Sequence, residues 1–410
     1  MVDGAMPSRL KAASDSLEIL SPFRRLAALL QGIEPAMSEI DLTIGEPRHP
    51  MPPFLADRLN ECIGEFAKYP PILGTNALRQ AIAGWLRRRY PTLRDGLDAD
   101  RHILPLCGSR EGLFSAIFAA TARKPGNTRP TVLLPNPFYF AYAAAASAAQ
   151  AEAIYLTAPQ ESGFLPDLEA IDAGLLDRAA AFYLASPSNP QGAAASGTYL
   201  ERLIGLARKH DFLLFADECY SEIYCDAPPT GALAVAQQAF GDFSNVLSFQ
   251  SLSKRSNLPG LRSGFCAGDP AVISAYGTFR NVSSPQMPLP IQAASAAVWA
   301  DEAHVEQSRA LYGEKFAACD RILGDRFGYR RPQGGFFLWL DVESHGGGVE
   351  MAKTLWKACG VKLLPGAYLA HAAAGASNPG DNHVRLALVD SLTRTETALE
   401  RMVAWAEGKG

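Results

Sequence analysis

The residues with the clearest chemical potential lie in the segment 251–265, which reads SLSKRSNLPGLRSGF. It places Lys254 among small hydroxyl residues, with Arg262 eight positions later and no acidic residue between them. A solvated surface lysine is the ordinary interpretation of such a residue. Here the fixed charge of Arg262 would lower the pKa of the lysine, which makes its amine a nucleophile towards carbonyl groups and a usable base. Arg262 itself suits bidentate binding of a phosphate.

A second candidate is Asp217, which ends the apolar run 212–216. A buried carboxylate at that point is costly unless it meets a cation or strong hydrogen-bond donors. It could cap a helix or pair with an arginine, or it could meet a protonated ring nitrogen. A carbonyl-reactive lysine, a phosphate-binding arginine and a buried aspartate are together what pyridoxal 5′-phosphate (PLP) requires, so the sequence predicts PLP as cofactor.

These residues need elements that bring them together. Short apolar runs alternate with longer amphipathic stretches, a pattern typical of an α/β fold with a mostly parallel sheet. The expected strands of this sheet are 131–135, 151–156, 180–185, 212–217, 245–250 and 262–268, and residues 196–210 form an expected crossover helix. Ligands gather at the carboxyl ends of the strands in such folds, so the polar segments that follow the strands form the expected site.

The length of 410 residues exceeds what one hydrophobic core normally serves, which predicts two domains. After residue 288 the pattern changes to a long helix over 292–323, followed by strands in GGFFLWLDV and HVRLALV. We therefore expect a large PLP-binding domain over residues 41–282 and a smaller domain over residues 283–410.

Composition limits the possible partners. The formal net charge is −4 and no long basic run occurs, which predicts no nucleic-acid or membrane partner. The seven cysteines form no C-x-x-C pair, which is typical of reduced thiols and predicts no metal site. We recognise neither a secretion signal nor an apolar stretch of membrane-spanning length, so a cytoplasmic location is expected.

The order of the functional residues resembles the class I/II, fold-type I PLP-dependent aminotransferases over nearly the whole chain. The matching positions are Asn189, then Asp217 and Tyr220 in DECY, Lys254 in SLSK, Arg262, and Arg385 in HVRLAL. The resemblance implies a large domain with a mostly parallel seven-stranded sheet covered by helices, a smaller α+β domain, and an N-terminal arm, residues 1–40, that packs with the small domain.

The resemblance also implies a role for each residue at the cofactor ring. Lys254 would bond to the cofactor aldehyde and later move the proton between the substrate Cα and the cofactor. Asp217 would keep the pyridine nitrogen protonated, while Asn189 and Tyr220 would donate hydrogen bonds to the ring oxygen O3′. Tyr139 would stack on the ring, although a core tyrosine is the commoner fate of such a residue.

The cofactor phosphate would lie at the segment CGSREGLF, where Gly108, Ser109 and Arg110 open a helix whose N-terminus suits an anion. Ser251, Ser253 and Arg262 would complete this phosphate site. Tyr69 would reach the phosphate from a neighbouring subunit, which implies a homodimer.

For the substrates, an amino acid and a 2-oxo acid, the resemblance implies that Arg385 grips the α-carboxylate as a bidentate fork. Gly45 and Asn189 would lie against the same carboxylate. A salt-bridged strand arginine and an ordinary turn glycine remain the alternatives for Arg385 and Gly45.

Within the family, four stretches are most similar to the succinyldiaminopimelate transaminases: TIGEPRHP, SLSKRSNLPGLRSGF, AASAAVWADEAHVEQSRALYGEKF and LLPGAYLA. This subgroup exchanges an amino group between glutamate and N-succinyl-2-amino-6-oxopimelate on the route to diaminopimelate and lysine. Such a substrate carries several carboxylates, for which Arg48, Arg255 and Arg280 are the candidate partners.

The segment FRNVSSPQMP, residues 279–288, departs from the aromatic and histidine-containing stretch of that subgroup. The substrate therefore has alternatives: aspartate, aromatic or kynurenine-type amino acids, or a carbon–sulfur β-lyase substrate. A non-catalytic PLP-binding regulator would need a DNA-binding module, and the roughly forty residues before DLTIGEP are too short and insufficiently basic for one.

Overall fold

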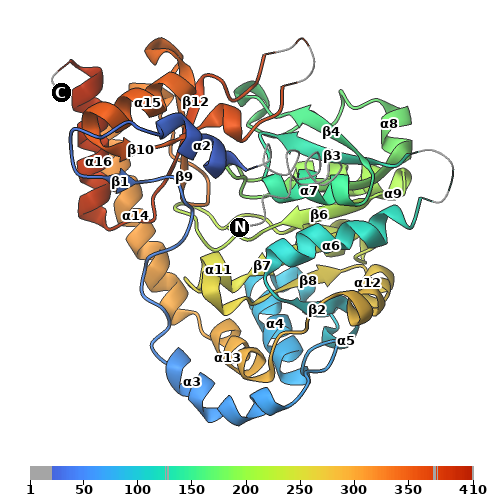
Figure 1. Cartoon of the computed structure of the whole chain (residues 1–410). Coiled ribbons are helices and arrows are strands. Elements are labelled where there is room, and N and C mark those ends of the chain that lie inside the picture. The colour runs from blue at the N-terminus through green and yellow to red at the C-terminus, as the bar shows by residue number, and fades with distance from the viewer. Residues whose placement is uncertain (1–20, 125, 127–128, 373–374, 376, 409–410) are drawn as a thin grey trace, which may run out of the picture.

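The computed structural model describes residues 21–124, 126, 129–372, 375 and 377–408. A seven-stranded sheet in the order β2-β8-β7-β6-β5-β3-β4 forms the centre of the larger unit (Figure 1). Its strands are β2 (Ile103–Leu106), β3 (Thr131–Asn136), β4 (Glu152–Thr157), β5 (Ala179–Ala185), β6 (Leu213–Asp217), β7 (Val246–Ser251) and β8 (Gly264–Gly268). β8 runs opposite to the other six strands, which are parallel to one another, and this confirms the predicted mostly parallel α/β fold.

Each predicted strand forms, with ends shifted by one or two residues. The predicted strand 262–268 begins only at Gly264, because Arg262 has a left-handed backbone with φ 55°. Strand β2 was not predicted, and its sequence explains why. Pro105 interrupts this short run, and proline is tolerated there because β2 lies at the edge of the sheet.

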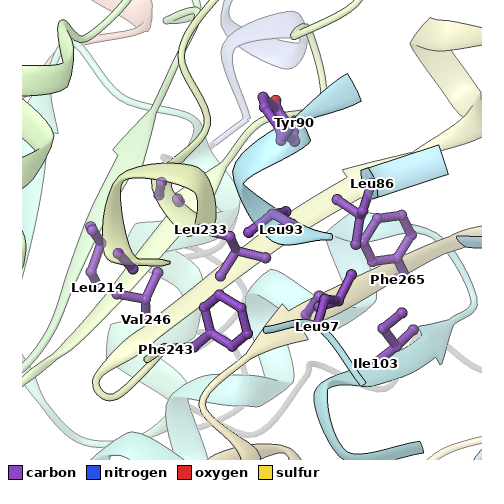
Figure 2. Close-up of a cluster of buried hydrophobic side chains, with 14 of the residues drawn as sticks. Leu86, Tyr90, Leu93, Leu97, Ile103, Leu214, Leu233, Phe243, Val246 and Phe265 are labelled. Atoms are coloured by element: carbon purple, nitrogen blue, oxygen red, sulfur yellow. The ribbon is translucent and has the colours of Figure 1, made fainter. Parts of the chain in front are cut away.

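Helices cover both faces of the sheet because successive strand residues point to opposite sides. In β6, Leu213 and Phe215 pack under α6 (Ser109–Thr121), α7 (Phe140–Ala148) and α12 (Pro270–Ser283). Leu214 and Ala216 face the other layer, which is built from α4 (Asn76–Arg89), α9 (Gly197–Lys209), α10 (Ala232–Phe240) and α13 (Leu289–Ala300). Figure 2 shows part of this second core, where Phe265 and Val246 of the sheet meet Leu86 of α4 and Leu233 of α10.

The predicted crossover helix over 196–210 is α9. Ser196 caps it by accepting a 3.1 Å hydrogen bond from the Tyr199 amide, which satisfies one of the free donors at the helix start. Its apolar residues recur at helical spacing and are buried against the sheet, as the sequence pattern predicts: Leu200, Leu203, Ile204 and Ala207.

The smaller unit contains an antiparallel sheet in the order β11-β12-β9 and the short parallel pair β1-β10. Its elements are β1 (Ile40–Asp41), β9 (Phe337–Asp341), β10 (Val361–Lys362), β11 (Leu364–Pro365), β12 (His383–Ala387), α14 (Ala303–Leu323), α15 (Gly347–Cys359) and α16 (Leu392–Ala406). Both predicted strands, β9 and β12, are present. In Figure 1, β1 lies beside these C-terminal elements, although it comes from the start of the chain.

The described part of the predicted N-terminal arm is α2 (Pro22–Leu30), and residues 1–20 of that arm lie outside the described residues. Leu26 and Leu30 of α2 pack on Trp356, Leu364 and Leu369, which belong to the C-terminal part of the chain. This packing joins the beginning of the chain to the smaller unit.

The long helix predicted over 292–323 is two helices, α13 and α14, separated by Asp301 and Glu302. Asp301 has an extended backbone, and its carboxylate accepts a hydrogen bond from the His304 amide, which starts a new helix. Val298 and Trp299 of α13 belong to the core of the larger unit, whereas Tyr312 and Phe316 of α14 belong to the smaller one. Although α13 follows the predicted boundary at residue 282, it packs with the larger unit.

The remaining α-helices are short: α3 (Leu55–Glu61), α5 (Ala99–His102), α8 (Ala173–Arg178) and α11 (Leu252–Arg255). The 3₁₀ turns are η1 (Ile63–Ala67), η2 (Pro91–Leu93), η3 (Gln160–Ser162), η4 (Pro259–Leu261), η5 (Arg326–Gly328), η6 (Glu343–His345) and η7 (Gly366–Tyr368). In the portion of the chain that the structure describes, no helix combines the length and apolar character needed to cross a bilayer.

Candidate active site

The carboxyl ends of β5, β6 and β7 open into a pocket of about 190 Å³ that reaches the smaller unit. Nine of the predicted site residues line it: Gly45, Ser109, Arg110, Tyr139, Asn189, Asp217, Tyr220, Lys254 and Arg385. The polar segments that follow strands of the sheet therefore meet at one edge, as expected for this class of fold. A larger hollow of about 710 Å³ lies elsewhere and contains none of these residues.

Lys254 lies in α11, one turn after the end of β7. Its ammonium group donates a hydrogen bond to the carbonyl oxygen of Gly45. Burial lowers the pKa of Lys254 to about 8, so a substantial fraction of the amine is neutral and nucleophilic near that pH. Sequence analysis predicted that Arg262 would lower this pKa. In the structure, burial is the largest cause of the lowering, and the arginines that act in the same direction are Arg385 and Arg110.

Asp217 is the last residue of β6 and is 8% exposed. The Tyr142 hydroxyl donates a 2.6 Å hydrogen bond to its Oδ2 atom, and the Cys219 amide donates to its Oδ1 atom at 3.3 Å. Burial raises the pKa of Asp217, and no described residue forms an ion pair with it. A buried carboxylate held in this way suits the protonated nitrogen of a pyridine ring.

Tyr142 was not singled out from the sequence, because the alanine-rich stretch around it indicates only a packed helix. Its signal was its position three residues after Tyr139, which is the N-cap residue of α7; the two rings meet edge-on at the start of this helix, with 5.5 Å between centroids. Tyr139 accepts a 2.6 Å hydrogen bond on its hydroxyl from Nε of Arg110. Burial raises the pKa of Tyr139.

The predicted phosphate site is assembled around the start of α6. This helix begins at Ser109 without a side-chain cap, so its first amide groups are available to an anion. Gly108 has φ 86°, and the Arg262 guanidinium lies so close to it that a larger residue would displace the arginine. Arg262 is held there by the carbonyl groups of Pro259 at 2.8 Å and Cys107 at 3.1 Å.

The two predicted serines lie beside this helix start. Ser251 donates a 2.8 Å hydrogen bond to Ser253, and the Ser253 amide in turn donates to Ser251 at 3.0 Å. The Ser109 amide lies near Gly264 at the start of β8, so β7 and β8 both adjoin the phosphate site. The arrangement provides hydroxyl, amide and guanidinium donors, which is the donor set that a phosphate requires.

Arg385 lies in β12 and is 4% exposed. Its Nη1 donates to Asn189 Oδ1 at 2.9 Å and its Nη2 to the Thr43 carbonyl at 2.7 Å, while Nε has no partner. Burial lowers the pKa of Arg385 to about 10, and no described carboxylate pairs with it. The predicted alternative, a salt-bridged strand arginine, is therefore wrong. A buried guanidinium with an open Nε fits a carboxylate brought by a ligand.

Gly45 and Tyr220 complete the part of the site near Arg385. A Cβ atom on Gly45 would lie 2.6 Å from the Phe337 ring, so the loop approaches β9 more closely than any other residue would allow. Tyr220 packs edge-on against Phe336 and Phe337, and burial raises its pKa well above the ordinary value. Its hydroxyl therefore stays protonated and remains a hydrogen-bond donor.

Three candidate partners for the distal carboxylates of the substrate are already engaged. Arg255 is buried against the rings of Trp85 and Trp299 and pairs with Glu302, and Arg280 is buried and pairs with Glu111. Arg48 pairs with Asp390 at 2.9 Å. None of the three lines the pocket, so the prediction that they bind substrate is not supported by their positions.

Tyr69 is fully exposed and lies outside the pocket of its own chain. Sequence reasoning also missed the apolar wall of the pocket, to which distant elements contribute: Pro22, Phe23, Ile44, Leu113, Phe138, Phe140, Phe337 and Leu369. Phe23 belongs to α2, and no local motif shows that this helix folds over the site.

A mostly parallel seven-stranded sheet with a reactive lysine, a buried aspartate and a helix start for phosphate defines a PLP-dependent enzyme of fold type I. Residues 38–400 match the family model described as aminotransferase class I and II. The chain therefore belongs to the class I and II aminotransferases, whose members use PLP, and the predicted family and cofactor are confirmed.

The chain is 29% identical to an LL-diaminopimelate aminotransferase of Nitratidesulfovibrio vulgaris (strain DSM 19637 / Miyazaki F), over 95% of this chain and 98% of the relative. An aminotransferase structure from Neisseria meningitidis is 40% identical with a TM-score of 0.87, covering 94% of this chain and 97% of that one. A probable N-succinyldiaminopimelate aminotransferase from Thermus thermophilus is 26% identical with a TM-score of 0.80, covering 93% and 99%.

Proposed function

We propose that this aminotransferase exchanges an amino group between glutamate and N-succinyl-2-amino-6-oxopimelate. The observation that carries the proposal is the charge of the pocket. Arg385, Lys254 and Arg110 contribute positive charge, whereas Asp217 is the only carboxylate among the described residues that line it. Because Asp217 lies at the floor and is bonded to Tyr142, the remainder of the pocket suits an anionic substrate.

This charge distribution discriminates between two related substrates. Free LL-diaminopimelate carries an ammonium group at its distal end, which would call for a carboxylate in the pocket. In the succinylated substrate that amine is an amide and the distal end is only negative. Arg110 is the available cation, since its described contacts are the Tyr139 hydroxyl and the nearby aromatic rings.

Each residue would act on the bound substrate or on a proton. Bound PLP supplies an electron-accepting ring that stabilises negative charge at the substrate Cα. Arg385 and Asn189 would hold the α-carboxylate and so orient the Cα–H bond towards Lys254. Lys254 would remove and return the proton, because burial lowers its pKa to about 8, near the pH at which the enzyme would work. Asp217 would hold the proton of the pyridine nitrogen, while Tyr220 would donate a hydrogen bond to the ring oxygen.

We also propose that the protein is a homodimer in which Tyr69 contacts the phosphate site of the other subunit. The surface around Tyr69 supports this, because large apolar side chains are exposed there: Ile63 (61%), Phe66 (56%) and Leu73 (44%). The hollow of about 710 Å³ adjoins them, with Ile72, Ile103 and Ile273 in its lining. Such a contiguous apolar surface is typical of an interface between chains.

We also propose a cytoplasmic location. All seven cysteines are free thiols, as expected for a protein in a reducing compartment.

A half-reaction experiment tests the proposed substrate. The protein with bound PLP is mixed separately with N-succinyl-LL-diaminopimelate, LL-diaminopimelate and glutamate, and the loss of the PLP absorption band is followed. Rapid loss with glutamate and the succinylated compound, and little with free LL-diaminopimelate, is the expected result. Faster loss with free LL-diaminopimelate would contradict the proposed substrate and would instead indicate the activity for which the Nitratidesulfovibrio relative is named. No loss with any amino acid would exclude transamination.

A further inference from the structure

A buried lysine outside the pocket has no role in the reaction described above. Lys315 of α14 is 2% exposed, and none of the described carboxylates forms an ion pair with it. Its ammonium group donates hydrogen bonds to Nε2 of His49 at 2.8 Å and to the Leu388 carbonyl at 3.1 Å. Burying an ammonium group in this way is costly, so its hydrogen bonds must hold specific groups in place.

The hydrogen bond from Lys315 determines which ring nitrogen of His49 carries the proton. An ammonium group can only donate, so Nε2 of His49 accepts and Nδ1 carries the ring proton. Nδ1 therefore donates to Ser308 at 3.1 Å. Burial and Lys315 lower the pKa of His49 to about 4, which keeps the ring neutral. The ring also packs on Tyr312, with 4.3 Å between centroids.

The chain of hydrogen bonds continues to the segment that carries the reactive lysine. Ser308 exchanges hydrogen bonds with the side-chain amide of Asn257, at 3.2 and 3.4 Å. Asn257 lies three residues after Lys254 and also donates to the Pro50 carbonyl at 3.2 Å. The buried cluster of Lys315, His49, Ser308 and Asn257, here called the loop anchor, thus joins α14, the loop 42–50 and the Lys254 segment.

The loop 42–50 is held differently at its two ends. Its beginning is fixed to the substrate-binding strand: the Ala387 amide donates to Leu42 at 2.7 Å, and Arg385 donates to Thr43 at 2.7 Å. Gly45 follows, with its carbonyl on Lys254. The far end depends on side chains, namely the loop anchor and the ion pair of Arg48 with Asp390.

We propose that Lys315 and His49 are positioning residues that set the affinity for the amino-acid substrate by fixing the far end of the loop 42–50. Ile44 and Gly45 of this loop line the pocket, and Gly45 already lies at contact distance from Phe337. A loop released at its far end would move Gly45 away from the place where the substrate carboxylate meets Arg385. The inference rests on the proposed transamination for its kinetic consequence, and not for the existence of the anchor.

Two variants test the proposal. Lys315→Met keeps the length of the side chain and removes the donor. If the single variant folds poorly, the double variant Lys315→Met with His49→Phe also removes the ring nitrogen that Lys315 no longer pairs. The matched control is Lys124→Met, because Lys124 also donates two hydrogen bonds, to the carbonyl groups of Asp177 at 3.2 Å and His210 at 2.8 Å, away from the pocket.

Two readouts separate positioning from general stability in protein with bound PLP. The KM for glutamate should rise about 10-fold, with kcat and the PLP dissociation constant changed less than about threefold, as expected when a positioning contact is lost. Hydrogen exchange of the amides in residues 44–49 should accelerate about 10-fold or more, because local opening then costs less free energy. Lys124→Met should leave both quantities unchanged.

Unchanged exchange of the loop in both variants would overturn the anchor itself. Faster exchange with an unchanged KM would overturn its role in substrate affinity. If the natural protein converted no amino acid, the proposed function would fail separately, and the exchange measurement would still decide whether the anchor holds the loop.

Discussion

At the scale of single residues, the site is built from buried charged groups that form no ion pair with any described residue. Burial lowers the pKa of Lys254 to about 8 and of Arg385 to about 10, and it raises the pKa of Asp217. A protein core normally excludes such groups because desolvation is costly. In the proposed function each of these groups has a counterpart in the cofactor or the substrate, so the unpaired charges indicate which ligand groups would bind there.

The proposed bidentate grip of Arg385 on the substrate carboxylate leads to the first prediction. Arg385→Lys keeps the charge but loses the planar fork that a carboxylate requires, so kcat/KM for glutamate should fall roughly 10- to 100-fold, the equivalent of losing one hydrogen bond to a charged group. Steady-state kinetics measures this fall. Arg321→Lys, in an exposed pair with Glu396, is the control and should retain full activity. A loss below threefold in Arg385→Lys would show that the substrate carboxylate binds elsewhere.

The lowered pKa of Lys254 leads to the second prediction. Only the neutral amine attacks an aldehyde, so the rate at which PLP-free protein captures PLP should rise with pH through about 8 and level off above it. Stopped-flow absorbance across pH 6.5 to 10 records this curve. Lys254→Ala should stay folded, capture no PLP covalently and complete no transamination. A midpoint near the ordinary lysine pKa, about 10.4, would contradict the burial seen here.

At the scale of elements, the N-terminus of α6 is both the expected phosphate site and the position of an acidic residue. Glu111 lies in the first turn of α6, where its charge would repel a phosphate. Arg280, at the end of α12, neutralises it through two 3.1 Å hydrogen bonds and also donates to the Pro105 carbonyl of β2. The segment 279–288 that departs from the expected subgroup thus begins beneath the phosphate site and not in the substrate pocket.

The third prediction concerns this pair. Arg280→Met would leave Glu111 without its cationic partner below the phosphate, so the PLP dissociation constant should rise at least about 10-fold, which corresponds to about 1.4 kcal/mol. Adding Glu111→Gln should recover most of the affinity, because the repelling charge is then gone. Arg123→Met, which breaks an exposed pair with Asp211, is the control. PLP titration followed by absorbance measures all of these, and an unchanged affinity in Arg280→Met would exclude the role.

At the scale of the whole molecule, several buried or half-buried histidines have lowered pKa values. Desolvation is the largest cause for His49, His102, His304 and His383. In the unfolded chain a histidine titrates near pH 6.5. Since the unfolded state takes up these protons first, their contribution to stability is complete above pH 6.5 and is lost as the pH falls below it.

The fourth prediction follows from this loss of stability at low pH. The Tm should fall by several degrees between pH 7.5 and pH 5. Asp242 and Asp320, whose pKa values are lowered, extend the loss below pH 4, whereas Asp217 and Glu218, with raised pKa values, act in the opposite direction. Scanning calorimetry of the protein with saturating PLP measures the change. A Tm that stayed constant from pH 7.5 to pH 5 would contradict the burial of the histidines.

Features of the protein that depend on local pattern could be predicted from the amino-acid sequence. Strand alternation and the punctuation after each strand predicted the α/β fold, and the order from Asn189 to Arg385 predicted the family and its cofactor. These signals can be recognised in the sequence because strand period, helix spacing and residue type are local properties. The loop after each predicted strand could therefore be assigned to one edge of the sheet.

The side chains that complete the site became evident only in the folded protein. Tyr142 contacts Asp217 from 75 residues away, Phe23 reaches the pocket from α2, and Lys315 reaches the loop 42–50 from α14. The structure also shows that Arg255 and Arg280 lie outside the substrate pocket, where each forms an ion pair with a glutamate. Such contacts join residues far apart in the chain, and no local spacing encodes which buried charge will find a partner and which will be left for a ligand.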